Sequence, residues 1–562
     1  MIRVSMGVLL ALLCAVAAGA EPAPVRYALS PVIEQGALRA LAVDIDFQAD
    51  PSGRTTLRFV DGFEHETRPG RYAEGLEILG AEGVTPRPDG GAEIRSAPGA
   101  RLHARYRIRS GYDAPPTTRD SDQTKPIVLA DWFYVAGELV FAYPEGQHRS
   151  PATFNWKGGE SGFRFASDLE RLSDRDGVVD DILDSILMGS PRLRVTEGRG
   201  RYKDLRLAAL GTFQHYDDAA FADMTFRVID AERAFWGDGP SPFLVTLAPL
   251  KTSVGESYGG TGRSDAFALW VGETLPLADL RRLLAHEYFH TWNPAELGRP
   301  GKQRRDAWLS EGFTDFYARR LLLRAGLYTL ADYAKAWNED LLAYGVSPAR
   351  NATEDQIAKG YWQDEALEEI TYKRGALLAA LFDAQLRRKG RGLDPVVRRM
   401  RALRNKDPES GLRANFAAAF AAAAGRPATP EIDRYALRGE TLTLPGDTFA
   451  CLTLGRVTQP IFALGFDLEA TGATGVFSGV DPAGPAYAAG LRDGMKRLAR
   501  EGGAMNDSSV EIAYRVVDTA GQERVIRFKP EGETSVTFQR LSVRETMTPS
   551  ERKACARALG GG

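Results

Sequence analysis

Two histidines that lie four residues apart constrain this chain more than any other feature of its sequence. His286, Glu287 and His290 form a His-Glu-x-x-His pattern inside the segment Pro276–Trp292. Apolar residues recur in this segment near helical spacing, and its opening proline is tolerated in a first helical turn. Pro294 prevents the helix from continuing much further. The segment is therefore predicted to form one helix that projects both imidazoles from the same face.

This spacing suits a metal ion. Two neutral imidazoles on one helix face form two corners of a tetrahedral zinc site, and Glu287 between them can act as the general base on a metal-activated water. The chain contains only six histidines, so the pattern should arise by chance in about one in a few hundred chains of this composition. The alternative is a pair of ordinary histidines on a helix. We predict a site for one Zn²⁺ ion.

A catalytic zinc site needs a third protein ligand and an open position, and no third histidine follows nearby. The carboxylates that follow are Glu296, Asp306 and Glu311. Glu296 lies in a loop close to the end of the helix, and Asp306 lies beside two arginines. Glu311 lies among apolar residues, where a carboxylate needs a partner to keep its charge. We therefore predict His286, His290 and Glu311 as the zinc ligands.

Two further residues are candidates for supporting roles. Asp315 follows Glu311 by four residues and so lies on the same helix face, where it can accept a hydrogen bond from His286. The alternative for Asp315 is an exposed ion pair with Arg319. Tyr372 opens a later helix and can donate a hydrogen bond to the oxyanion of hydrolysis, although a helical tyrosine more often belongs to a core.

Patterns of apolar and polar residues divide the chain into three parts. Residues 21–150 alternate with period two, as in Leu41–Phe47, and indicate a β-sandwich-like domain. Strand-like stretches followed by helices indicate a mixed α+β domain over residues 151–435. Strands and turns return over residues 455–545. The predicted fold class is multidomain α+β.

The chain carries signs of export. Residues 1–20 combine a basic residue, an apolar stretch and small residues up to Ala20, which is typical of a cleaved signal peptide; an uncleaved anchor is the alternative. Removal of this segment leaves Cys451 and Cys555, which either form a bridge in an oxidising compartment or remain two thiols. We expect a periplasmic or secreted protein without a membrane span in the mature chain. The net charge of −3 gives no indication of a nucleic-acid partner.

The motifs around these residues resemble those of the glycyl aminopeptidase family of gluzincin metallopeptidases. The matching segments are His286-Glu287-Tyr288-Phe289-His290-Thr291-Trp292-Asn293, Trp308-Leu309-Ser310-Glu311-Gly312-Phe313-Thr314-Asp315 and Tyr372-Lys373-Arg374-Gly375-Ala376-Leu377, with Arg374 where the family usually has lysine. The resemblance implies an N-terminal β domain, a thermolysin-like catalytic domain and a C-terminal PDZ-like domain. It assigns the zinc ligands as above, the general base to Glu287 and the oxyanion donor to Tyr372.

One departure from the family concerns the substrate. Members commonly carry Gly-Gly-Leu-Glu-His in a loop before the zinc helix, and this chain keeps only Gly259 and Gly260 in the loop that ends at Ser264. In related aminopeptidases an acidic residue there holds the amino terminus of the substrate, so aminopeptidase specificity stays open. Arg263 would instead favour a carboxylate, or is simply solvated. We predict the two glycines as substrate-binding residues and Ala266–Val271 as the strand along which the substrate pairs.

The last part of the chain resembles a PDZ domain more weakly. Ala463-Leu464-Gly465-Phe466 is similar to the carboxylate-binding loop, Gly475-Val476-Phe477 to the strand that follows, and residues 486–494 to the turn after the short helix. The usual motifs beyond Met495 are missing. This segment either binds peptides or has a purely structural role.

Together these features predict a zinc-dependent peptidase that acts on a peptide or protein substrate. One alternative is a catalytically inactive protein that retains the peptidase fold and binds peptides. Another is a zinc hydrolase that acts on a different class of substrate. The first reading needs a metal ligand set and a general base, and the sequence contains residues suited to both.

Overall fold

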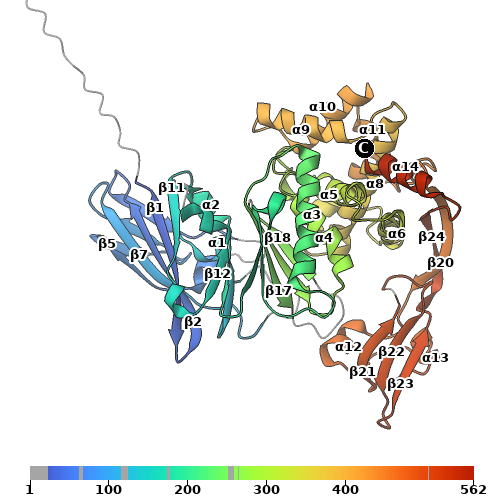
Figure 1. The fold of residues 1–562 in the computed structure, drawn as a ribbon, viewed down its shortest axis with the longest axis horizontal. Helices are drawn as coiled ribbons and strands as arrows, with labels where there is room; N and C mark the ends of the chain where they lie inside the picture. The colour runs from blue at the N-terminus through green and yellow to red at the C-terminus, as the bar shows by residue number, and fades with distance from the viewer. Residues whose placement is uncertain are drawn as a thin grey trace, which may run out of the picture. The chain divides into compact units, whose positions relative to one another are not determined.

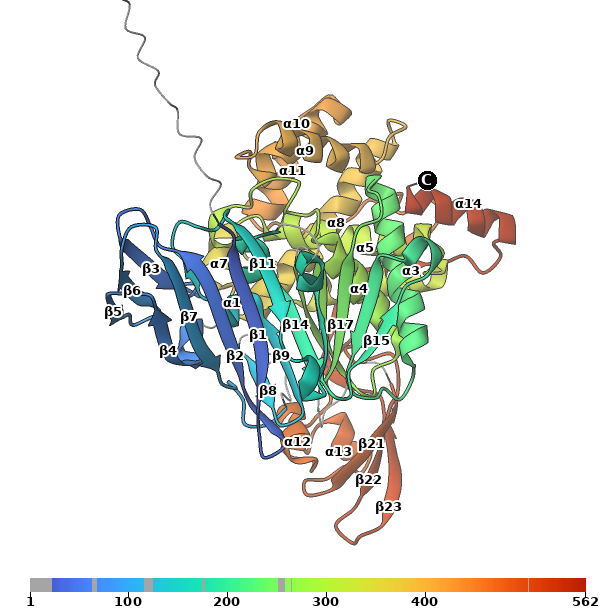
Figure 2. The same cartoon turned by 60° about the vertical axis from the view of Figure 1, so that its left-hand side comes forward.

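The computed structural model describes residues 23–62, 68–115, 125–173, 177–250, 258–263, 265–503 and 505–561. The predicted signal peptide and Ser264 of the predicted substrate loop lie outside these residues. The chain divides into two compact units, whose segments can be followed by colour in Figures 1 and 2. The first unit comprises residues up to Arg109, Gly137–Ser161 and Leu169–Asp184, and the second comprises Ser110–Ala136, Gly162–Asp168 and the chain from Ser185 onward.

The first unit consists mainly of the alternating strands predicted for the N-terminal part. Leu41, Val43 and Ile45 lie in its core, each at most 1% exposed. One sheet has the order β13-β11-β1-β2-β7-β4, with β1 (Val25–Glu34), β2 (Ala37–Gln48), β4 (Ala73–Leu79), β7 (Arg101–Ile108), β11 (Pro151–Trp156) and β13 (Gly177–Val178). Another has the order β10-β3-β6-β5, with β3 (Arg54–Arg58), β5 (Gly83–Pro86), β6 (Ala92–Arg95) and β10 (Tyr143–Pro144). The short helices here include α1 (Gly137–Val140) and α2 (Val179–Leu183). The sandwich-like arrangement stays a prediction.

The second unit begins with two further sheets. One has the order β12-β14-β9-β8, with β8 (Ile127–Leu129), β9 (Trp132–Ala136), β12 (Arg164–Ser167) and β14 (Ile186–Ser190). The other has the order β15-β16-β17-β19-β18, with β15 (Arg194–Glu197), β16 (Leu205–Ala209), β17 (Phe243–Leu250), β18 (Tyr258–Gly262) and β19 (Ala266–Gly272). Strands β16, β17 and β19 run parallel, and β18 pairs antiparallel with β19 at the end of the sheet.

This topology corrects two expectations about the substrate strand. Ala266–Val271 forms most of β19, which lies between β17 and β18, so its backbone groups already pair on both sides. A substrate therefore has no place to pair along it. The segment with Gly259 and Gly260 is also not a loop, because it forms β18. Among the described residues β18 is the terminal strand on this side of the sheet.

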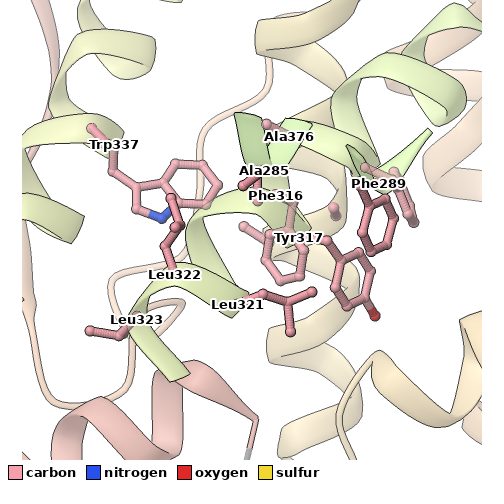
Figure 3. Packing of buried hydrophobic residues seen from close by; sticks show 14 of the residues in the cluster. Ala285, Phe289, Phe316, Tyr317, Leu321, Leu322, Leu323, Trp337 and Ala376 are labelled. Atoms are coloured by element: carbon pink, nitrogen blue, oxygen red, sulfur yellow. The ribbon is translucent and has the colours of Figure 1, made fainter. Parts of the chain in front are cut away.

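Helices follow this sheet along the chain and carry the predicted metal ligands. Their bounds are α3 (Asp218–Trp236), α4 (Leu277–Phe289), α5 (Ala307–Arg324), α6 (Leu330–Val346), α7 (Glu354–Gly360), α8 (Glu365–Arg387), α9 (Asp394–Lys406), α10 (Leu412–Ala424) and α11 (Thr429–Glu431). Figure 1 shows α3 and α4 beside β17 and β18. One apolar core joins the sheet with these helices. Within it Phe289 of α4 stacks on Tyr317 of α5, with ring centroids 5.1 Å apart (Figure 3).

The C-terminal part has a hydrophobic core of its own around Phe477 and Tyr514. Its elements are β20 (Thr453–Phe462), α12 (Leu468–Thr474), α13 (Pro485–Ala488), β21 (Lys496–Gly502), β22 (Ile512–Val517), β23 (Glu523–Phe528), β24 (Glu531–Ser542) and α14 (Pro549–Gly560). The strand expected at Gly475–Phe477 is replaced by an isolated bridge from Val476 to Lys496. The PDZ-like assignment of this part stays a prediction.

A disulfide ties the end of the chain to the helical part. Cys451 and Cys555 form a bridge with their Cα atoms 5.7 Å apart, which decides between the two possibilities left open by the sequence. The multidomain α+β class is also confirmed, since the chain divides into two compact units and contains both sheets and helices. None of the helices in the described ranges combines the length and apolarity that a membrane crossing requires.

Candidate active site

Helices α4 and α5 bring the three predicted ligands together. The Nε2 atoms of His286 and His290 are 3.1 Å apart, and Oε2 of Glu311 is 3.5 Å from the first and 3.2 Å from the second. Zinc bonds of about 2.1 Å in a tetrahedron place neighbouring ligand atoms about 3.4 Å apart. The observed spacings fit this value. Two imidazoles and one carboxylate are also a donor set that zinc prefers, so the residues present fit the ion.

The remaining imidazole nitrogens are already engaged, which fixes the direction of both rings. Nδ1 of His286 lies 3.1 Å from Oδ1 of Asp315, and Nδ1 of His290 lies 2.8 Å from the backbone oxygen of Asn293. Both acceptors favour a proton on Nδ1 and leave each Nε2 with a lone pair toward the shared point. The orientation that a metal needs is therefore built into the protein.

Charge at this point favours a cation. Burial alone lowers the pKa of His286, but hydrogen bonds to Asp315 and Glu311 outweigh it and raise this pKa to about 10. Burial likewise lowers the pKa of His290, and the charge of Glu311 more than reverses the effect. Burial alone raises the pKa of Glu311, whereas the two histidines hold it below its usual range. The same negative charge that attracts protons attracts a metal ion in competition with them.

Asn293 is a structural residue that sequence reasoning missed. Its side chain is 1% exposed, and its Nδ2 donates to the backbone oxygens of Leu309 and Ser310 at 3.1 and 2.9 Å. It also donates to Oγ1 of Thr314 at 3.0 Å. These bonds join the end of α4 to the first turns of α5. The polar residue directly before Pro294 was the available signal, since the chain must turn there.

A contact between two glycines positions Tyr372 relative to the ligands. A Cβ atom at Gly312 would collide with the backbone of Gly375, and one at Gly375 would collide with the backbone oxygen of Trp308. Helices α5 and α8 therefore cross at backbone contact. Tyr372 lies in the third turn of α8 and does not open the helix as expected. The close crossing brings its ring to 5.7 Å from the ring of His286, stacked at an angle of 24°.

Tyr372 is held in its protonated form. Burial, followed by the negative charge of Glu311, raises its pKa well above the ordinary value for a tyrosine. A phenol in this state donates a hydrogen bond and does not compete for a metal as a phenolate. The position beside His286 and this protonation state suit an oxyanion donor.

The other two candidate ligands lie elsewhere. Glu296 forms an ion pair with Arg401 at 2.6 Å, and Asp306 forms one with Arg413 at 2.6 Å. Neither belongs to the group of side chains that could hold a metal ion. Both carboxylates are thus engaged by arginines, a partner that local sequence spacing does not reveal.

Glu287 is half-buried between the two histidines on α4, and the edge strand passes close to it. A methyl group placed at Gly262 of β18 would lie 3.8 Å from the backbone oxygen of Glu287. Gly260 faces the ring of Phe267, where a Cβ atom would collide. The predicted substrate glycines therefore belong to the strand next to the predicted general base.

Asp315 makes both of the contacts that the sequence left as alternatives. It accepts from His286, and its Oδ2 lies 3.4 Å from Arg319, whose side chain is fully buried rather than exposed. Arg319 also pairs with Asp340, which lies 3.3 Å from Lys373. A chain of buried and partly buried charged side chains thus runs from His286 to Lys373 on the helix of Tyr372.

We expect Asp315→Asn to weaken zinc binding about 10- to 100-fold, because the amide is a poorer acceptor for the Nδ1 proton of His286. Competition with a chromophoric chelator measures this affinity. Asp340→Asn is the matched control, since it disturbs Arg319 without touching a histidine. It should lower stability by about 3 kcal/mol and leave zinc affinity unchanged. Equal affinities in Asp315→Asn and the native protein would contradict the role of Asp315.

Glu232 of α3 is a buried carboxyl group that the sequence did not single out. It is 1% exposed, and neither oxygen has a hydrogen-bond partner among the described residues. Burial raises its pKa well above the ordinary value of 4.5, although the charge of His286 opposes the shift. The folded protein therefore keeps this proton at pH values where the unfolded chain releases it. The contribution of this protonated carboxyl group to the free energy of unfolding is fully present below pH 4.5 and is lost as the pH rises.

We expect Glu232→Gln to gain stability relative to the native protein as the pH rises, by up to about 1.4 kcal/mol per pH unit. The amide removes the titration and keeps the shape of the side chain. Calorimetry of both proteins at about pH 5 and about pH 8, with equal zinc loading, measures the difference. Glu197→Gln, at an exposed position, controls for the loss of one carboxylate. A constant difference for Glu232→Gln would contradict the expectation.

Known proteins resemble this chain in sequence over the site and in fold over most of its length. Residues 279–378 match the sequence model of a family described as M61 glycyl aminopeptidase. Curated proteins give no match. A solved aminopeptidase N family protein from Idiomarina loihiensis has a TM-score of 0.66 at 14% identity, covering 95% of this chain and 100% of that chain. An M1 zinc metallopeptidase from Deinococcus radiodurans has a TM-score of 0.44 at 15% identity, covering 75% of this chain and 95% of that chain.

The large-scale fold is therefore shared with an aminopeptidase N family protein. The matched segment runs from the first turn of α4 into α8 and includes the predicted ligands, Glu287, Asp315 and Tyr372. This agrees with the resemblance inferred from the motifs. The segment of this chain that forms the candidate active site is thus similar in sequence to the family described as M61 glycyl aminopeptidase.

Proposed function

We propose that this protein is a zinc-dependent peptidase and that His286, His290 and Glu311 hold one Zn²⁺ ion. The observation that carries the proposal is the convergence of three ligand atoms from two helices at tetrahedral spacing. The family of the matched segment supports the same conclusion. The positions of Glu287 and Tyr372, which we assign as general base and oxyanion donor, favour an active enzyme over a protein that retains the fold only to bind peptides.

The chemistry divides between the ion and three side chains. When bound, zinc supplies Lewis acidity to the scissile carbonyl and lowers the pKa of the attacking water. Glu287 takes a proton from that water and delivers it to the leaving amine. Tyr372, kept protonated by burial, donates a hydrogen bond to the carbonyl oxygen as negative charge develops on it. Asp315 keeps the ring of His286 in a fixed direction throughout.

We propose that the substrate backbone pairs with β18. An extended peptide can add to the edge of a sheet through main-chain hydrogen bonds, and among the described residues β18 is the edge strand. Gly259 and Gly260 of this strand have no side chains, so a peptide can approach its backbone closely. A peptide on β18 would pass Glu287, since Gly262 of the same strand lies beside it.

The test combines metal analysis with digestion of a peptide library. We expect one zinc per chain, loss of cleavage after dialysis against a chelator, and recovery when zinc is returned. A chain that binds no zinc would refute the proposal. Zinc binding without cleavage of any peptide would support the inactive peptide-binding alternative. Peptides with acetylated amino termini then separate the two modes of attack, because an aminopeptidase cleaves only those with a free amine.

A further inference from the structure

The loop between α4 and α5 carries an arginine in an uncommon backbone conformation. Gln303 and Arg304 are consecutive non-glycine residues, and both have a φ of 57°. L-residues rarely adopt this left-handed region, and consecutive cases are maintained only when surrounding contacts favour them. Such strain concentrates at functional sites. The conformation directs the side chain of Arg304 toward the metal ligands.

The guanidinium group of Arg304 lies at the edge of the active site. Its Nη1 is 3.5 Å from Oε1 of Glu311, the carboxylate oxygen that does not face the histidines. Its Cζ lies 4.8 Å from the ring centroid of Trp362 and 5.2 Å from that of Tyr361. Tyr361 in turn is close enough to Tyr372 to raise the pKa of that residue. Arg304 thus lies against a pair of aromatic rings that also contact each other, with centroids 4.9 Å apart, and one of these rings belongs to the neighbour of the predicted oxyanion donor.

Arg304 can still donate hydrogen bonds to a ligand. A guanidinium group has five N–H donors, and no hydrogen bond from Arg304 is found within the described residues. Its side chain is 42% exposed, and the neighbouring Trp362 is 50% exposed. The ion pair with Glu311 is long, at 3.5 Å between its closest nitrogen and oxygen atoms. A divalent ion on Glu311 would compensate the charge of that carboxylate, which leaves the cation of Arg304 available to another anion.

We propose that Arg304 binds a carboxylate of the peptide substrate next to the scissile bond, so that this protein prefers anionic peptides. The planar guanidinium group matches a carboxylate in a two-pronged geometry. The aromatic rings hold it in place and reduce the entropy lost on binding. The carboxylate is either the C-terminal group of a short peptide or an aspartate or glutamate side chain. The inference rests on the proposed peptidase function, since it names the substrate of that site.

The experiment compares matched peptides derived from one that the native enzyme cleaves. One pair carries a C-terminal carboxylate or amide, and other pairs carry glutamate or glutamine at each position flanking the cleaved bond. We expect the native enzyme to prefer one carboxylate form about 10- to 100-fold in kcat/KM. Arg304→Gln should cleave both forms at the rate of the neutral one. The pair that shows the preference identifies the source of the carboxylate.

Arg305 provides a matched control on the same loop. It pairs with Asp355 at 2.7 Å and forms no ion pair with Glu311 among the described residues, so Arg305→Gln should keep the preference. Equal cleavage of all pairs by the native enzyme would overturn the proposal. So would an equal loss on all pairs in Arg304→Gln together with weaker zinc binding, since Arg304 would then only position Glu311.

A binding measurement separates this inference from the peptidase proposal. Zinc-loaded Glu287→Gln protein should bind the carboxylate peptide about 10-fold more tightly than its neutral partner in calorimetry. Adding Arg304→Gln should remove that difference. If the native protein cleaves no peptide, the pairs are made from a peptide that the zinc-loaded protein binds, and a difference within them would refute the peptidase function and keep the carboxylate site. Cleavage by the native protein without any difference in binding would keep the peptidase function and refute the carboxylate site.

Discussion

Glu287→Gln is expected to lower kcat/KM for peptide cleavage by about 10²- to 10⁴-fold while zinc binding is unchanged. The glutamine keeps the size of the side chain and can still form hydrogen bonds, but it cannot accept a proton from water at neutral pH. Glu287 lies outside the ligand group of His286, His290 and Glu311, so the metal should remain. Steady-state kinetics on one defined peptide, with zinc measured on the same preparations, provides both quantities.

A matched substitution tests whether loss of a carboxylate near the site is enough to produce the effect. Glu296 follows α4 closely but forms its ion pair with Arg401, away from the ligands. Glu296→Gln should therefore retain activity within a few-fold of the native enzyme. If Glu287→Gln also retained most of its activity with zinc bound, the proton acceptor would have to be another group. A variant that lost zinc would show that Glu287 supports the ligand geometry instead.

Local periodicity was enough to predict an N-terminal strand and the helix of the two histidines. Leu41–Phe47 lies within β2, and the predicted zinc helix corresponds to α4, which begins just after Pro276 and ends at Phe289. These elements have strong patterns of period two or of helical spacing, which do not depend on distant contacts. The strand β18 was not predicted, because its glycine-rich sequence has little intrinsic tendency to form a strand. It forms through pairing with β19, a contact that only the folded chain provides.

The site was predictable where its residues lie on one helix face. The spacing of four residues places His286 beside His290 and Glu311 beside Asp315. Contacts between elements escaped the same reasoning. The bonds from Asn293 to α5 depend on a turn after α4, and the position of Arg304 depends on a left-handed loop. Neither feature has a periodic signal, because turns and loops are determined by individual residues and their tertiary partners.

The approach of Tyr372 to the ligands is the feature with the next largest expected effect. We expect Tyr372→Phe to lower kcat for peptide cleavage about 10²- to 10³-fold and to change KM little. The hydroxyl group would stabilise charge that is present in the transition state and not in the bound peptide, so its loss should appear in kcat. The phenylalanine ring can keep the stacking on His286, and zinc affinity should therefore be preserved.

Tyr361 allows this loss to be attributed to one hydroxyl group. It is a second buried tyrosine near Glu311, and its pKa is raised to about 12, mainly by burial. Tyr361→Phe removes the same atom from a neighbouring position and should reduce kcat far less, because its ring mainly supports Arg304. A similar loss in both variants would point to a general effect of polarity around the site. An increase in KM at constant kcat in Tyr372→Phe would place its hydroxyl on the bound peptide instead of the oxyanion, since such a change reports binding that is uniform along the reaction.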